Sequence, residues 1–233
     1  MVRRNMMMTT PSLKESLRSA IWARNLTDEQ MARVEASTFE RCVPKGGFVC
    51  HKGEKVENWI GIIDGMVKMN NFSPSGKSVT FSGVPPGGWF GEGSLLKDET
   101  RKYDAMALRD SRIAHMPAAT FLWLLETSLP FTHFLLMQLN ERLGQFIGMV
   151  ESDRLLDINT RVARCVASMF NPHLYPGIDE LLPISQEEIG LLSGSSRQRA
   201  NQALQVLEKH GLLRLDYGGI RVLDVDGLRR YQE

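Results

Sequence analysis

The chain has 233 residues, 42% hydrophobic and 24% charged, with a formal net charge of +1, which is ordinary for a soluble globular protein of one or two domains. Cys42, Cys50 and Cys165 are too scattered for a disulfide framework or a zinc site, and the histidines show no ligand spacing. Arg3 and Arg4 precede no apolar stretch of the signal-peptide kind, and no apolar run is long enough to span a membrane. We therefore expect an intracellular, cytoplasmic protein without a metal site.

The N-terminal part of the chain changes from helical to strand patterning near residue 39. Short helices are expected over residues 13–22 and 28–36, and Thr27 is the predicted N-cap of the second. From residue 39 to residue 116, short runs rich in Val, Ile and Phe alternate with Gly and Pro. Many short strands at this spacing are typical of an all-β sandwich or barrel.

Four of these strands are easiest to place. Runs at 59–63 and 66–70 flank Asp64 and Gly65, a pair that predicts a β-hairpin. Further strands are expected over residues 77–81 and 112–116.

A long helix follows the strands. After a short helix at 117–126, Pro130 opens a helix that reaches about residue 157. Its apolar residues alternate at spacings of three and four, as in a coiled-coil seam. The seam consists of Leu136, Leu139, Leu143, Phe146 and Val150. The alternative is a helix that packs only on its own chain; further apolar residues beside the seam suggest that the helix does both.

Residues 182–215 carry the pattern of two short helices joined by a turn. Ser185 and Glu188 form a predicted capping box at the start of the first helix, and Ser195 and Gln198 form a predicted capping box at the start of the second. Runs at 212–215 and 220–223 flank a glycine-containing turn and predict a β-hairpin. A helix-turn-helix followed by a hairpin is a winged helix.

The outer face of the second helix is rich in amide and guanidinium groups, which make bidentate hydrogen bonds to adenine and guanine edges. The face consists of Gln198, Gln202, Gln205 and Lys209, flanked by Arg197, Arg199 and Asn201. Nine basic and nine acidic residues follow position 157, so attraction to DNA must be local. The alternative interpretation is a buried helical hairpin with a polar outer face.

Residues 184–190, 194–197 and 207–209 resemble the DNA-binding domain of the Crp/Fnr transcription regulators, and the resemblance runs from about residue 39 to residue 223. It implies double-stranded DNA and RNA polymerase as partners and a homodimer paired through the long helix. The DNA-binding residues it indicates are Ser185, Gln186, Ser196, Arg197, Gln198, Arg199, Asn201 and Gln202.

Residues 88–95 resemble the phosphate-binding cassette of that family's cyclic-nucleotide-binding β-roll. Glycines there let backbone N–H groups surround an anion, Glu92 is suited to a ribose hydroxyl, and Arg101 is suited to a phosphate. The implied effector site consists of Gly91, Glu92, Gly93, Ser94, Arg101, Lys102, Phe146 and Ile147. The alternative is that the glycines only form a tight turn.

The chain departs from the cyclic-AMP-binding members at several of these positions. Lys102 stands where those members have a serine, and Phe146 and Ile147 stand where they have hydroxyl residues. We therefore expect a small anionic or nucleotide effector other than cyclic AMP. The alternative is a closed pocket in which Lys102 or Arg101 pairs with Glu92. Gln198 and Gln202 replace a glutamate and an arginine, so a different base sequence should be read.

The sequence as a whole predicts an α+β fold with an N-terminal jelly-roll-like β-roll, a long dimerisation helix and a C-terminal winged helix-turn-helix. The expected domains are residues 1–128, 129–157 and 158–233. The predicted function is a homodimeric transcription regulator without catalytic activity. The alternative function is a ligand- or partner-binding module that has lost DNA binding.

Overall fold

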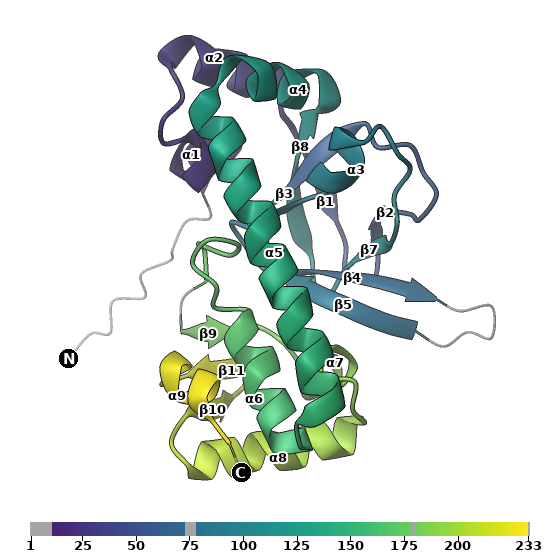
Figure 1. Cartoon of the computed structure of the whole chain (residues 1–233), viewed down its shortest axis with the longest axis vertical. Helices are drawn as coiled ribbons and strands as arrows, with labels where there is room; N and C mark the ends of the chain where they lie inside the picture. The colour runs from purple at the N-terminus through teal and green to yellow at the C-terminus, as the bar shows by residue number, and fades with distance from the viewer. Residues whose placement is uncertain (1–10, 73–77, 179, 233) are drawn as a thin grey trace.

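The computed structural model describes residues 11–72, 78–178 and 180–232. Arg3 and Arg4, on which the signal-peptide expectation rests, lie outside the described residues. A β-roll covered by short helices forms one end, and a helical unit with a small sheet forms the other (Figure 1). One long helix runs along both (Figure 1). The expected fold class is therefore confirmed: an α+β chain with a β-roll, a long helix and a winged helix-turn-helix.

The roll consists of two four-stranded antiparallel sheets that enclose an apolar core. The first sheet has the order β1-β8-β3-β6 and the second β2-β7-β4-β5. The strands are β1 (Phe39–Val43), β2 (Phe48–Cys50), β3 (Asn58–Asp64), β4 (Val67–Phe72), β5 (Ser78–Val84), β6 (Trp89–Phe90), β7 (Asp104–Ala107) and β8 (Ser111–Pro117). A short helix, α3 (Glu92–Leu96), follows β6.

The predicted hairpin at Asp64 and Gly65 is wrong. β3 pairs with β8 and β6, whereas β4 pairs with β5 and β7, so this turn carries the chain from one sheet to the other. Gly65 has a φ of 93°, and a side chain there would collide with Ser111. Both strands place apolar residues in the core between the sheets, and this alternation is the same whether the strands pair or face each other.

Helices cover the outer face of the first sheet. They are α1 (Leu13–Ser19), the 3₁₀ helix η1 (Ile21–Ala23), α2 (Asp28–Ser37) and α4 (Ala118–Thr127). Thr27 caps α2 as predicted, through a capping box with Gln30. An aromatic cluster joins these helices to the sheet, because the rings of Trp22, Trp59 and Trp89 lie within 5.6 Å of one another.

The long helix is α5 (Leu129–Leu155), capped by Ser128 and containing Pro130 in its first turn. One face is buried against the roll through Phe131, Leu135 and Gln138. The face with Leu136 and Leu143 is exposed in the single chain. The helix thus packs on its own chain and also presents the predicted seam to solvent.

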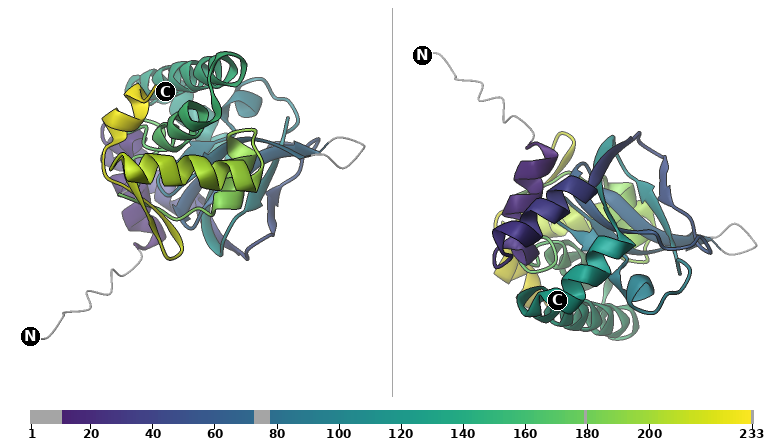
Figure 2. Two further views of the ribbon diagram at one scale, coloured as in Figure 1. Left: turned by 90° about the horizontal axis from the view of Figure 1, so that it is seen from below. Right: turned by 90° about the horizontal axis from the view of Figure 1, so that it is seen from above.

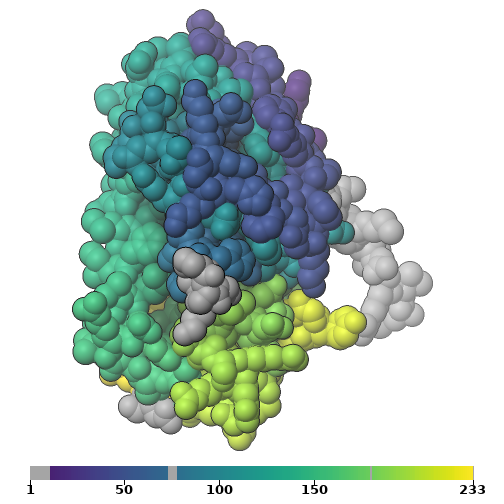
Figure 3. Space-filling view, turned by 90° about the vertical axis from the view of Figure 1, so that its right-hand side faces the viewer, coloured from purple at the N-terminus to yellow at the C-terminus, as the bar shows by residue number. Residues whose placement is uncertain are grey.

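The C-terminal unit contains α6 (Ile158–Ser168), α7 (Gln186–Leu192), α8 (Arg197–Lys209) and α9 (Val225–Arg230) with β9 (Leu181–Leu182), β10 (Leu213–Asp216) and β11 (Gly219–Val222). β10 and β11 form the predicted hairpin, and β9 adds a third strand that the sequence pattern did not reveal. The roll packs directly on this unit (Figure 3). Met66 and Leu108 of the roll belong to the apolar core of the C-terminal unit.

Capping residues define the helices of this unit. Asp157 caps α6 by accepting from the Asn159 and Thr160 amides, and Ser185 forms the predicted capping box with Glu188 on α7. The second predicted capping box is wrong, because Ser196 caps α8 by accepting from the Arg199 amide. The turn between the helices holds the Ser195 hydroxyl 2.9 Å from the Ser193 hydroxyl, away from the first turn of α8.

Candidate DNA interface and effector pocket

Helix α8 presents its polar face to solvent. Its apolar face is fully buried through Ala200, Ala203, Leu204 and Leu207. The predicted DNA-contacting residues Arg197, Gln198, Arg199 and Gln202 are exposed, and Asn201 is half-buried. Seen from below, α8 lies across the near end of the molecule (Figure 2, left). This placement leaves a helix of major-groove dimensions free on its outer side.

Two arginines of the wing share one carboxylate. Asp216 accepts from Arg214 Nε at 2.7 Å and from Arg221 Nε at 2.9 Å. These two hydrogen bonds lower the pKa of the Asp216 carboxyl to about 2, so it stays ionised at neutral pH. The side chain of Tyr217, at the tip of the hairpin, is fully exposed. The hairpin, with Arg214, Arg221 and Asp216, therefore keeps one net positive charge.

Ser185 and Gln186 lie at the start of α7. They line a groove of about 430 Å³ between the roll and the wing, together with Lys45 and Arg109 of the roll. The Ser185 hydroxyl accepts from the Glu188 amide as a helix cap. Ser185 is therefore the N-cap of α7, and its contact with DNA stays a prediction.

The cassette in the roll is closed by an ion pair from the long helix. Gly91 has a φ of 97°, which turns the chain so that the Glu92 side chain points inward, where it is buried. Arg142 Nε lies 2.7 Å from Glu92 Oε1, and Arg142 also donates to the Trp89 carbonyl. Trp59 Nε1 donates to the other Glu92 oxygen at 3.4 Å. Both oxygens of the Glu92 carboxylate thus accept a hydrogen bond from the protein itself.

This pair corrects the predicted closed pocket, in which Lys102 or Arg101 neutralised Glu92. Lys102 is on the surface, with its Nζ 2.8 Å from Glu99. Arg101 is buried and donates from Nη2 to the Asn58 carbonyl at 2.9 Å. Sequence reasoning missed Arg142 because it lies one helical turn before Phe146, which belongs to the predicted exposed seam. Its signal was periodic: Gln138, Arg142 and Gln145 put polar groups on the inward face of α5.

Several polar groups inside the roll have no hydrogen-bond partner among the described residues. They are the side-chain amide of Asn70, the hydroxyl of Thr80, Nη1 of Arg101 and Nε2 of His115. All four residues are at most 5% exposed. Burial, with Arg41 and Arg101 nearby, lowers the pKa of His115 to about 4, so its imidazole is neutral. Buried unpaired donors and acceptors of this kind favour a polar guest such as water or a small ligand.

The remaining predicted effector residues are not gathered at Glu92. Gly93 is exposed, and the Ser94 hydroxyl donates to the Thr100 carbonyl. Phe146 and Ile147 are exposed on α5, next to Leu143 and Val150. In the single chain, Glu92 and Arg101 are therefore the charged members of the predicted site that point into the roll.

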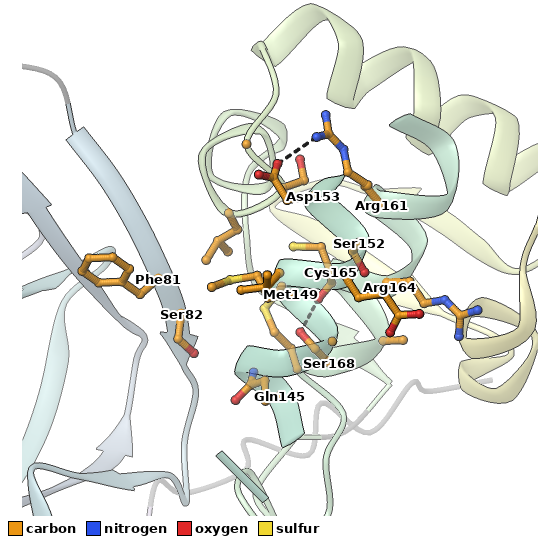
Figure 4. A pocket seen from close by; sticks show the side chains of 18 of the residues that line it. Phe81, Ser82, Gln145, Met149, Ser152, Asp153, Arg161, Arg164, Cys165 and Ser168 are labelled. Carbon is orange, nitrogen blue, oxygen red and sulfur yellow. Dashed lines mark hydrogen bonds and ion pairs between the residues drawn. The ribbon is translucent and has the colours of Figure 1, made fainter. Parts of the chain in front are cut away.

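A cavity of about 970 Å³ lies between the roll and the helical unit. Ser82 of β5 lines one side, and Met149 of α5 and Cys165 of α6 line the other (Figure 4). Arg161 donates to Asp153 at 3.0 Å at its rim. Burial raises the pKa of the Cys165 thiol to about 12, which keeps it protonated and unreactive as a nucleophile.

The described residues contain no helix that is long and apolar enough to cross a membrane. They also contain no group of three or more His, Cys, Asp or Glu side chains placed to hold a metal ion.

Comparison with known proteins relates both halves of the chain to one family. Residues 40–128 match the cyclic nucleotide-binding domain, and residues 160–231 match the Crp-like helix-turn-helix domain. A cyclic AMP receptor protein from Thermus thermophilus is 27% identical over 78% of this chain and 82% of its own length. A CRP-like cAMP-activated global transcriptional regulator from Mycobacterium tuberculosis is 27% identical over 80% of this chain and 85% of its own length.

Solved structures show the same fold. FixK2 from Bradyrhizobium japonicum superposes with a TM-score of 0.70 at 16% identity, covering 84% of this chain and 98% of its own. The c-di-GMP-responsive regulator CLP from Xanthomonas campestris superposes with a TM-score of 0.61 at 21% identity, covering 84% and 99%. The order of the two matched domains, the roll, the long helix and the winged helix together identify the chain as a member of the Crp/Fnr family of transcription regulators.

Proposed function

We propose that this regulator is a cytoplasmic homodimer that binds a near-palindromic operator through α8 and recruits or blocks RNA polymerase there. The observation that carries the proposal is the free outer face of α8, where Arg197, Gln198 and Gln202 are all exposed. Two-fold symmetry would place two such helices in successive major grooves, with half-sites about one helical turn apart.

The exposed stripe on α5 supports pairing of two chains. Leu136 and Leu143 are 62% and 59% exposed in the single chain, and Ile147 and Val150 continue the stripe. Contiguous apolar side chains at this spacing are costly in water and are suited to a second copy of the same helix.

The effector that we propose for the roll is a small anionic or nucleotide molecule other than cyclic AMP. Glu92 already has a cationic partner in Arg142, and Lys102 is paired with Glu99 on the surface. The unpaired groups of Asn70 and Thr80 leave polar positions for a different ligand. The named cyclic-AMP-activated relatives make cyclic AMP the natural competitor to test.

Selection of binding sequences from a library of randomised DNA duplexes tests the function. The wild type should enrich a near-palindrome. Gln198→Ala, Gln202→Ala and Arg197→Ala should each relax selection at one base step and weaken binding by about 1–3 kcal/mol. Arg24→Ala and Asn25→Ala are the matched controls, because both residues are exposed in the segment between η1 and α2, and these variants should enrich the wild-type sequence.

The same selection decides between the alternatives. If no sequence is enriched, the chain is a regulatory module without DNA binding. Repeating the measurement with cyclic AMP or cyclic GMP tests the effector proposal, and micromolar cyclic AMP that switches DNA affinity would contradict it.

A further inference from the structure

The roll and the helix-turn-helix unit exchange core residues. Met66 and Leu108 of the roll belong to the apolar core of the helical unit. In return, Leu174 and Tyr175, from the segment between α6 and β9, belong to the core of the roll, beside Met69 and Phe90. The side chains of Leu174 and Tyr175 are both almost fully buried. A reciprocal insertion of this kind resists rotation of one unit against the other, because turning either unit would open a cavity in both cores.

We call residues 171–177 the clasp, because this segment of the helical unit is held at several points by the roll and α5. Asn171 Nδ2 donates to Glu141 of α5 at 2.9 Å. The His173 ring stacks on Phe134 of α5 with centroids 5.2 Å apart. These contacts lie along one side of α5 and lead to Tyr175.

At the far end of the clasp, two glycine-containing turns cross closely. A side chain on Gly177 would lie 2.6 Å from the Pro86 carbonyl, and one on Gly88 would press on the Tyr175 ring at 3.1 Å. This close crossing therefore depends on the absence of side chains at both glycines. It places the Tyr175 ring in the apolar core of the roll.

The Tyr175 hydroxyl sits between β5 and α5. It donates to Gln145 Oε1 at 3.3 Å and shares a hydrogen bond of 3.0 Å with the Ser82 hydroxyl. Ser82 and Gln145, the two hydrogen-bond partners of the phenol, both line the cavity between the roll and the helical unit. One side chain of the helical unit thus joins a strand of the roll to the long helix.

We propose that Tyr175 is a positioning residue for DNA binding, which locks the helix-turn-helix unit onto the roll and α5 and thereby holds α8 outward. This inference rests on the proposed function. In the locked arrangement α8 lies below the C-terminal end of α5 (Figure 1), and Arg197, Gln198 and Gln202 on its polar face are exposed. Without the lock, each α8 of a dimer explores other orientations, and the two helices meet successive grooves less often.

Three variants of the full-length protein test the proposal. Tyr175→Leu removes the ring and the hydroxyl, and Tyr175→Phe removes only the hydroxyl. Phe121→Leu is the matched control, since Phe121 is equally buried but belongs to the cluster on the far side of the first sheet. The probe is a duplex enriched by the wild type, and a second readout is thermolysin cleavage at the exposed Leu155, where α5 ends.

Tyr175→Leu should bind the duplex at least about fivefold more weakly, within the range usual for coupling between sites, with unchanged base preference and faster cleavage. Tyr175→Phe should restore part of both losses. Phe121→Leu should lower the unfolding temperature without changing either readout. Equal DNA affinity and cleavage for Tyr175→Leu and the wild type, or equal losses for Phe121→Leu, would overturn the proposal. If the wild type enriches no duplex, the proposed function fails, and the cleavage rates alone decide the role of Tyr175.

Discussion

The ion pair between Glu92 and Arg142 gives the sharpest quantitative prediction. Their side chains are only 3% and 12% exposed, and the two charges are 2.7 Å apart. Arg142→Met keeps an unbranched side chain as far as the position of Nε and removes the guanidinium, which leaves the Trp59 indole as the side-chain donor to the buried Glu92 carboxylate among the described residues. Removing one partner of a buried pair typically costs about 3–5 kcal/mol. That is a large part of the roughly 5–15 kcal/mol by which native proteins are stable.

A double-mutant cycle separates the pair from its surroundings. Glu92→Gln combined with Arg142→Met removes both charges, so the double variant should be at least about 2 kcal/mol more stable than the two single losses predict. Lys102→Met is the matched control, because its pair with Glu99 is on the surface with Lys102 62% exposed. Loss of such a pair should cost less than about 1 kcal/mol.

Urea unfolding followed by tryptophan fluorescence measures these free energies, because Trp59 and Trp89 both contact the pair. Protein concentration must be equal in all samples, since dimerisation shifts apparent stability. The reasoning is refuted if Arg142→Met costs no more than Lys102→Met, or if the double variant shows no coupling.

Two other predictions concern pH and assembly. Burial, with Arg41 and Arg101 nearby, lowers the pKa of His115 to about 4 in the folded protein, against about 6.5 when unfolded. The contribution of neutral His115 to the free energy of unfolding is therefore fully present above pH 6.5 and is lost as the pH falls toward 4. Between pH 7 and pH 5 the wild type should therefore lose about 2 kcal/mol more than His115→Gln in urea unfolding, and equal losses would contradict the buried neutral imidazole. Leu143→Asp should make the protein monomeric in light scattering and abolish operator binding, because a carboxylate would face its symmetry mate in an apolar seam; a variant that stays dimeric would exclude the seam.

Local sequence determined the helices and some of their N-caps. Thr27 and Ser185 cap helices as predicted, because a hydroxyl reaches a first-turn amide within three residues of the chain. The buried face of α8 was also predicted, since helical spacing alone decides which side chains share a face. Motif spacing likewise indicated the family.

Only the tertiary structure decided which distant groups meet. Whether β3 pairs with β4 depends on how two sheets stack, and strand alternation is the same for both arrangements. Arg142 reaches Glu92 across 50 positions of sequence because α5 crosses the cassette. Tyr175 enters the roll because the clasp folds back over α5. Short-range patterns fix local conformation, whereas such long-range pairings depend on the packing of complete elements, which no window of the sequence contains.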